Sequence, residues 1–123
     1  MSEATPRRYT GVSVGAVLML SSPVLMADLK LVADLALKHK LPTVTFFGEF
    51  ARAGGLMAYG PNLLDTYRQL GGIVGKVLHG ARPADLPAEL PTRFELVLNL
   101  RTAKTLGLVI PQSVLLRANE VIE

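Results

Sequence analysis

The chain has 123 residues, of which 50% are hydrophobic and 19% charged, so a packed core of one domain or part of one is expected. It has no cysteine, which excludes disulfides and thiolate metal sites. The net charge of +3 is spread along the chain, and the three Tyr and four Phe residues do not alternate with Lys or Arg, so no nucleic-acid partner is predicted.

The first 15 residues are polar and are predicted to be a loose tail. Apolar residues then predict a strand over Gly15–Leu20 that is buried on both faces and belongs to a parallel sheet. Arg7 and Arg8 before this run loosely imitate a signal peptide, but Ser21-Ser22-Pro23 interrupts it. The strand is therefore the favoured interpretation, no export signal is evident, and the run is too short to span a membrane.

A β–α–β unit is predicted next. Helical spacing of apolar residues indicates one helix over Leu25–Lys40, and Thr43–Phe47 has the β-branched and aromatic content of a strand. A right-handed crossover would make this strand parallel to the first. Residues 48–54 then predict a short helical turn. Glu49 is either a functional residue or an acid in the first turn that interacts favourably with the helix dipole.

An extended crossing segment follows, opened by Gly54-Gly55 and closed by Gly60-Pro61. Asn62 is predicted to cap a helix over Leu63–His79 with one apolar side. Glycines inside this helix are unfavourable, so close packing against another element is expected at Gly71, Gly72 and Gly75.

The last third of the chain begins with an irregular, proline-rich connection over 81–92. A third clear strand is predicted at Phe94–Asn99 and a short helix at Arg101–Leu106, ended by Gly107. A final helix is predicted over Gln112–Ile122.

No catalytic or metal-binding arrangement is found. His39 and His79 each close a predicted helix, where a cation suits the dipole, so neither a Ser/His/Asp triad nor a His-based metal site is expected. The glycines at 71, 72 and 75 fall within a helix and form no phosphate cradle. The chain is therefore predicted not to be an enzyme, and no cofactor or metal is predicted.

A series of short motifs resembles one family in order along the chain. They are Leu41-Pro42, Glu49-Phe50, 53–56, 59–62, 80–87, 94–99, 103–108, Ile110-Pro111 and 116–122. In this order they resemble the C-terminal part of bacterial ABC transporter substrate-binding proteins, in the branch that includes tryptophan/tyrosine-type uptake proteins. The resemblance covers about residues 16–123.

The resemblance implies an α/β chain with a partial type I periplasmic-binding-protein-like fold, in which a parallel sheet is flanked by helices and the N-terminal lobe is missing. It implies that residues 16–53 and 94–123 form the C-terminal lobe and that 54–61 is a hinge crossing. The helix at 62–79 would pack on the absent lobe. Hinge segments absorb the backbone changes of domain closure.

The resemblance also suggests which residues form the solute site and the hinge. The ligand-binding residues would be Ser21, Ser22, Pro23, Gly48, Glu49 and Asn62. The hinge residues would be Gly54, Gly55, Tyr59 and Gly60. Many relatives carry Asp where this chain has Ser22, which weakens the expectation that this loop binds a ligand amine. Loop polarity, helix capping or packing could account for the same residues.

The implied function is that of a truncated solute-binding component of an ABC importer, which binds a small solute such as an amino acid without catalysis. Its partners would be the solute and the transporter permease, and its place the periplasm or cell envelope. Exposed apolar surface could also drive homo-oligomer formation. The alternatives are a small flavodoxin-like interaction or signalling domain, which would need five strands within 123 residues, and a non-functional gene fragment.

Overall fold

The computed structural model describes residues 14–123, so most of the predicted tail at 1–15 lies outside the described residues. The strands are β1 (Val17–Leu18), β2 (Thr43–Thr45), β3 (Met57–Pro61), β4 (Phe94–Asn99) and β5 (Glu120–Ile122). The helices are α1 (Pro23–Met26), α2 (Leu29–Lys38), α3 (Gly48–Arg52), α4 (Leu63–Leu78), the 3-10 turn η1 (Pro83–Asp85), α5 (Leu100–Thr105) and α6 (Gln112–Leu115).

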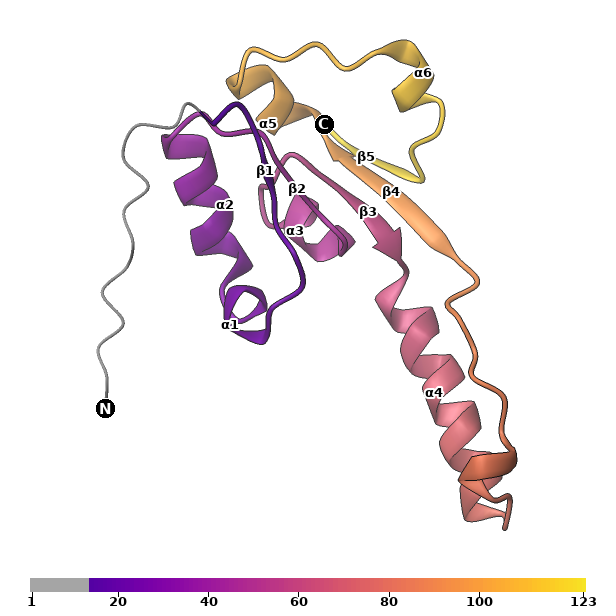
Figure 1. Cartoon of the computed structure of the whole chain (residues 1–123). Helices are drawn as coiled ribbons and strands as arrows, with labels where there is room; N and C mark the ends of the chain where they lie inside the picture. Colours follow the sequence, from indigo (N-terminus) through magenta and orange to yellow (C-terminus); the bar gives the residue numbers. More distant parts are fainter. Residues whose placement is uncertain (1–13) are drawn as a thin grey trace, which may run out of the picture.

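The five strands form one sheet in the order β1-β2-β3-β4-β5 (Figure 1). Strands β1, β2 and β3 are parallel, as the predicted β–α–β unit requires. Strand β4 runs antiparallel to β3, and β5 is parallel to β4, so the sheet is mixed rather than wholly parallel. The predicted α/β class with a sheet flanked by helices is confirmed, whereas a flavodoxin-like sheet would have the strand order 2-1-3-4-5.

The core lies between the sheet and the two helices that follow β1 and β2. Met19, Ala33 of α2 and Phe50 of α3 form one buried cluster. Ala58 and Val97 from neighbouring strands pack with Ala51 of α3 in a second cluster. Because side chains alternate across a strand, Met57, Tyr59, Phe94 and Leu96 face the other side of the sheet, where Val114 of α6 lies.

Two predictions near the N-terminal end are corrected. The strand expected over Gly15–Leu20 is only Val17–Leu18, and Leu18 is 64% exposed rather than buried. Strand β1 is an edge strand that pairs only with β2, so one side of it has no neighbour among residues 14–123. The helix expected over Leu25–Lys40 is broken into α1 and α2, because the backbone of Asp28 is not helical and its carboxylate accepts a hydrogen bond from Leu31 N at 3.0 Å.

The predicted final helix over Gln112–Ile122 is wrong. Only Gln112–Leu115 is helical, and Glu120–Ile122 forms strand β5 beside β4. Asn119 makes the junction, since its side-chain oxygen accepts from Leu96 N at 2.8 Å and its own N–H donates to the Leu96 carbonyl at 2.8 Å. These long-range bonds to β4 override the local helical pattern.

The predicted long helix is confirmed as α4, and it projects away from the sheet with the segment 79–93 returning along it (Figure 1). Lys76 lies 3.5 Å from Glu89 in the returning segment. No residue of α4 is buried. Gly71, Gly72 and Gly75 have open space where a Cβ would stand, so their expected close packing is not found among residues 14–123. No helix in this part of the chain is long and apolar enough to cross a membrane.

Candidate functional site

The loops that carry the predicted ligand residues lie at one edge of the sheet. Because β1, β2 and β3 run in the same direction, their carboxyl ends share that edge. Ser21-Ser22-Pro23 follows β1, Gly48-Glu49 follows β2 and Asn62 follows β3. Strand β4 runs the other way, and its residue Glu95, paired with Gly60, lies near its beginning and hence at the same edge.

The two serines begin a helix without capping it. Ser22 is in the N-cap position of α1, but its side chain makes no capping hydrogen bond, and its carbonyl oxygen accepts from Met26 N at 2.9 Å. Pro23 is the first residue of α1, where the loss of an N–H costs nothing. The Ser22 hydroxyl is therefore not used to cap this helix.

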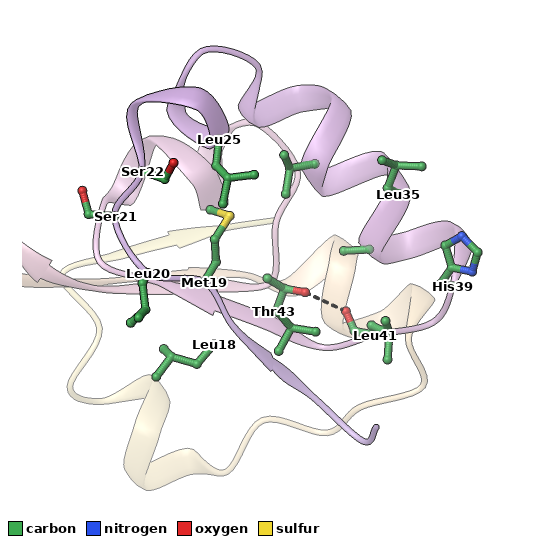
Figure 2. A pocket seen from close by; sticks show the side chains of 13 residues that line it. Leu18, Met19, Leu20, Ser21, Ser22, Leu25, Leu35, His39, Leu41 and Thr43 are labelled. Carbon is green, nitrogen blue, oxygen red and sulfur yellow. Dashed lines mark hydrogen bonds between the residues drawn. The ribbon is translucent and has the colours of Figure 1, made fainter. Parts of the chain in front are cut away.

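An apolar pocket of about 500 Å³ extends from these serines between β1 and α2 (Figure 2). Ser21 and Ser22 lie at one end and His39 at the other, with Met19 and Leu25 between them. A volume of this size with a few polar groups at one end is typical of a site for a small molecule. The pocket also follows the unpaired side of β1, so it is equally a surface on which another polypeptide segment could pack.

Gly48 and Glu49 are placed by the first turn of α3. Glu49 Oε1 lies 3.4 Å from Arg52 Nη1, whereas Oε2 is buried and has no hydrogen-bond partner among the described residues. A Cβ at Gly48 would stand 2.9 Å from Glu95 Oε1, so a side chain here would force the end of the Glu95 side chain to shift. The Glu49 side chain as a whole is 44% exposed, so its carboxylate lies at the surface of this edge although Oε2 itself is covered.

Arg52 joins three carboxylates from separate parts of the chain. Its Nη2 lies 2.6 Å from Glu120 Oε2 and 3.8 Å from Glu95 Oε1. The hydrogen bond to Glu120 raises the pKa of the Arg52 guanidinium above its usual value; partial burial opposes the rise, and the charges of Glu120, Glu95 and Glu49 add to it. The guanidinium is thus positive at every working pH, and the three carboxylates leave the group with a net negative charge.

Asn62 uses both ends of its side-chain amide within the protein. Its Oδ1 accepts from Asp65 N at 2.9 Å, which confirms the predicted cap of α4. Its Nδ2 donates to Glu95 Oε2 at 2.9 Å. The structure therefore brings Gly48, Glu49 and Asn62 together around Glu95 and Arg52, while the serine loop lies at the same edge beyond β2.

The four predicted hinge residues lie in or just before β3, where packing accounts for the glycines. Gly54 has a φ of 111°, which favours glycine. A Cβ at Gly60 would stand 2.1 Å from the Phe46 carbonyl oxygen, and one at Gly55 would overlap the Phe50 ring at 2.1 Å. Tyr59 is exposed and its ring centroid is 6.0 Å from that of Phe94. A hinge role for these residues remains a prediction.

Sequence reasoning missed Arg52, Glu95 and Glu120. Glu95 is only 15% exposed and shares a face of β4 with Val97 and Asn99, both buried. An acidic residue in register with two inward-facing positions of a strand was a signal that could have identified it. Arg52 and Glu120 are 68 positions apart, and no local pattern shows that they meet. Residues 14–123 contain no group of three or more His, Asp or Glu side chains placed to hold a metal ion.

Comparison with known proteins assigns the family. The profile of the ABC transporter substrate-binding protein family matches residues 9–122, nearly the whole chain. The chain belongs to this family. Substrate-binding proteins of this kind bind small solutes, are non-catalytic and are typically periplasmic or extracellular. No curated protein sequence matches the chain.

Solved structures with this fold are larger than the chain. A conserved domain protein from Vibrio cholerae is 22% identical, with a TM-score of 0.81 over 87% of this chain and 36% of its own. An ABC domain in complex with L-Trp from Streptococcus pneumonia is 28% identical, with a TM-score of 0.81 over 89% of this chain and 37% of its own. A ligand-free, open substrate-binding protein with adhesive properties from Clostridium difficile is 20% identical, with a TM-score of 0.57 over 86% of this chain and 36% of its own. The chain thus spans slightly more than a third of their length.

Proposed function

We propose that this chain supplies one wall of the solute site in a substrate-binding protein of an ABC importer and performs no catalysis. The observation that carries the proposal is the meeting of three loops, after β1, β2 and β3, at one edge of the sheet. Ser21, Ser22, Pro23, Gly48 and Glu49 would contact the solute there, with Asn62 beside them. The family match over residues 9–122 supports this assignment.

The domain arrangement is proposed on the same basis. Residues 16–53 and 94–123 would form one lobe, 54–61 the crossing into a second lobe, and the helix at 62–79 would pack on that second lobe. The absence of any buried residue in α4 supports this proposal, because an amphipathic helix normally buries its apolar side. The transporter permease would be the partner, and the periplasm or cell envelope the location.

An amino acid is the solute class that the charges favour. Glu49 and Glu95 lie at this edge beside the Arg52 guanidinium, and the Glu49 side chain is 44% exposed, so a solute can reach it. A carboxylate of this kind suits the ammonium group of an amino acid. The apolar pocket beside Ser21 and Ser22 would accept its side chain. The Streptococcus structure that shares the fold is described as a complex with L-Trp.

Amide chemical-shift mapping of the full chain with L-amino acids, L-tryptophan included, tests the proposal. We expect saturable shifts at Ser22, Gly48 and Glu49 with one class of amino acid. Glu49→Gln should weaken binding by roughly tenfold, because it keeps an oxygen acceptor but removes the negative charge that strengthens a hydrogen bond from an ammonium group. Glu89→Gln, on the segment that returns along α4, is the matched control and should leave binding unchanged. Shifts scattered over the surface, or none with any amino acid, would contradict the proposal.

A further inference from the structure

Helix α4 is joined to the sheet at two adjacent points of the chain, Pro61–Asn62 and Arg93–Phe94, which together are called the root of α4. The chain leaves β3 at Pro61 and re-enters the sheet at Phe94, and these two residues are partners in the β3–β4 pairing. The backbone N–H of Asn62 donates to the Arg93 carbonyl at 3.0 Å, which closes the root. Because α4 has no buried residue, contacts at the root decide the direction in which the helix leaves the sheet (Figure 1).

Side-chain links cross this root at Asn62 and Asp65, and Gln69 Nε2 donates to Thr92 Oγ1 at 3.4 Å farther along α4. Asn62 Nδ2 donates to Glu95 Oε2 at 2.9 Å. Asp65 Oδ2 lies 3.1 Å from Arg93 Nη1, an ion pair without the alignment of a hydrogen bond. The Glu95 side chain is only 15% exposed, whereas that of Arg93 is 77% exposed. Solvent therefore screens the Asn62–Glu95 link less effectively than the Asp65–Arg93 link.

We propose that Glu95 is a positioning residue that, through Asn62, fixes the direction of α4 relative to the sheet. The side-chain amide of Asn62 is planar. Its oxygen accepts a hydrogen bond from Asp65 N in the first turn of α4, and its nitrogen donates one to Glu95 of β4. One rigid group is therefore hydrogen-bonded to both the helix and the strand. Glu95 is itself held from the α3 side, where its Oε1 lies 3.8 Å from Arg52 Nη2 and against Gly48.

This role changes the interpretation of Asn62. A side chain whose oxygen and nitrogen are both engaged within the protein contributes to the site by holding α4, and a solute contact is not needed to explain it. The role of Glu95 does not require solute binding. Its test therefore stands apart from the test of the proposed function.

Distances between two spin labels measure the direction of α4. The chain has no cysteine, so Lys38→Cys on α2 and Ala84→Cys near the far end of α4 can be labelled specifically. The unaltered root should give one narrow distance distribution. Glu95→Ala removes the hydrogen bond from Asn62 to a charged group. We therefore expect the population of molecules in which α4 points in other directions to rise roughly tenfold, which broadens the distance distribution.

Three further variants separate the link from general damage. Glu95→Gln keeps an oxygen acceptor for Asn62 and should remain narrow. Asn62→Asp keeps a capping oxygen for α4 but replaces the amide donor with a second carboxylate facing Glu95. Its distance distribution should therefore be as broad as that of Glu95→Ala. This variant keeps the test available if Glu95→Ala folds poorly. Glu120→Gln removes the negative charge of the main partner of Arg52 without touching Asn62 and should remain narrow. A narrow distribution for Asn62→Asp, or equal broadening by Glu120→Gln, would overturn the proposal.

Discussion

The sheet with α3 and the projecting helix α4 are stabilised in different ways within one chain. Phe50, Ala51 and Val97 are 0% exposed, and their burial against the sheet provides the hydrophobic free energy of this part. In α4 most of the large apolar side chains are exposed, Leu64 at 60% and Tyr67 at 62% among them. The sheet with α3 therefore has a buried core, whereas α4 depends on its cap and on local hydrogen bonds.

An isolated helix of this size is marginal in water. Helix α4 has 16 residues, close to the length at which even favourable sequences are only partly helical. Its interior glycines lower the helix propensity further. Its amphipathic pattern is that of a helix that packs on another surface, which agrees with the proposal that it covers a second lobe.

The largest difference between the two regions is expected from truncation of aromatic side chains. Phe50→Ala should lower the free energy of unfolding by about 3–5 kcal/mol, because it leaves a cavity in the core. Tyr67→Ala on α4 should change it by less than about 0.5 kcal/mol. Denaturant unfolding of both variants measures the difference, and similar losses would mean that α4 is part of the same packed unit.

The next largest effect is expected from replacing a glycine of the sheet, Gly60 in β3. Gly60→Ala places a methyl group 2.1 Å from the carbonyl oxygen of Phe46, the residue just after β2, so we expect a loss of about 3 kcal/mol. The obstructing atom belongs to the backbone and cannot rotate away. Thermal unfolding tests this, and a midpoint unchanged from the unsubstituted chain would show that the close approach is not maintained.

Removal of the cap tests the root of α4 and should have an intermediate effect. Asn62→Ala deletes the bonds to Asp65 N and to Glu95, and we expect the local stability of α4 to fall by about 2 kcal/mol. Hydrogen exchange of α4 amides should accelerate while β3 amides remain slow. Equal acceleration in both elements would show that the helix and the sheet unfold together.

The smallest expected effect has the opposite sign. Gly71→Ala in α4 meets no neighbouring atom, so it should stabilise the helix by about 1 kcal/mol through helix propensity alone. Far-ultraviolet circular dichroism should show increased helicity. A loss of helicity would indicate that Gly71 is in fact closely packed, for instance between two copies of the chain.

Local signals predicted local structure well. The cap at Asn62 and the apolar spacing after it correctly predicted α4, and Gly107 correctly marked the end of α5, where its φ is 72°. Strand β5 could not be predicted, because its pairing with β4 overrides a helical pattern in the sequence. The strand at Gly15–Leu20 was overestimated for a related reason, since strand length depends on neighbours that a sequence does not display.

The candidate site was predicted in outline only. The family resemblance suggested Ser22, Glu49 and Asn62 as site residues, and the structure places all three at one edge of the sheet. Their partners were not predictable, because Glu95 reaches Asn62 across 33 positions of sequence. The resemblance therefore named loops that lie at one edge, and the antiparallel pairing of β4 determined which side chains they meet there.

The most direct test of the difference between the two regions is amide hydrogen exchange of the full chain at a concentration where its mass is that of a monomer. The account predicts slow exchange in β2, β3 and β4, at rates set by global unfolding, and much faster exchange throughout α4. Equal protection of α4 and β3 in the monomer would contradict it, because the exposed helix would then be as stable as the buried sheet.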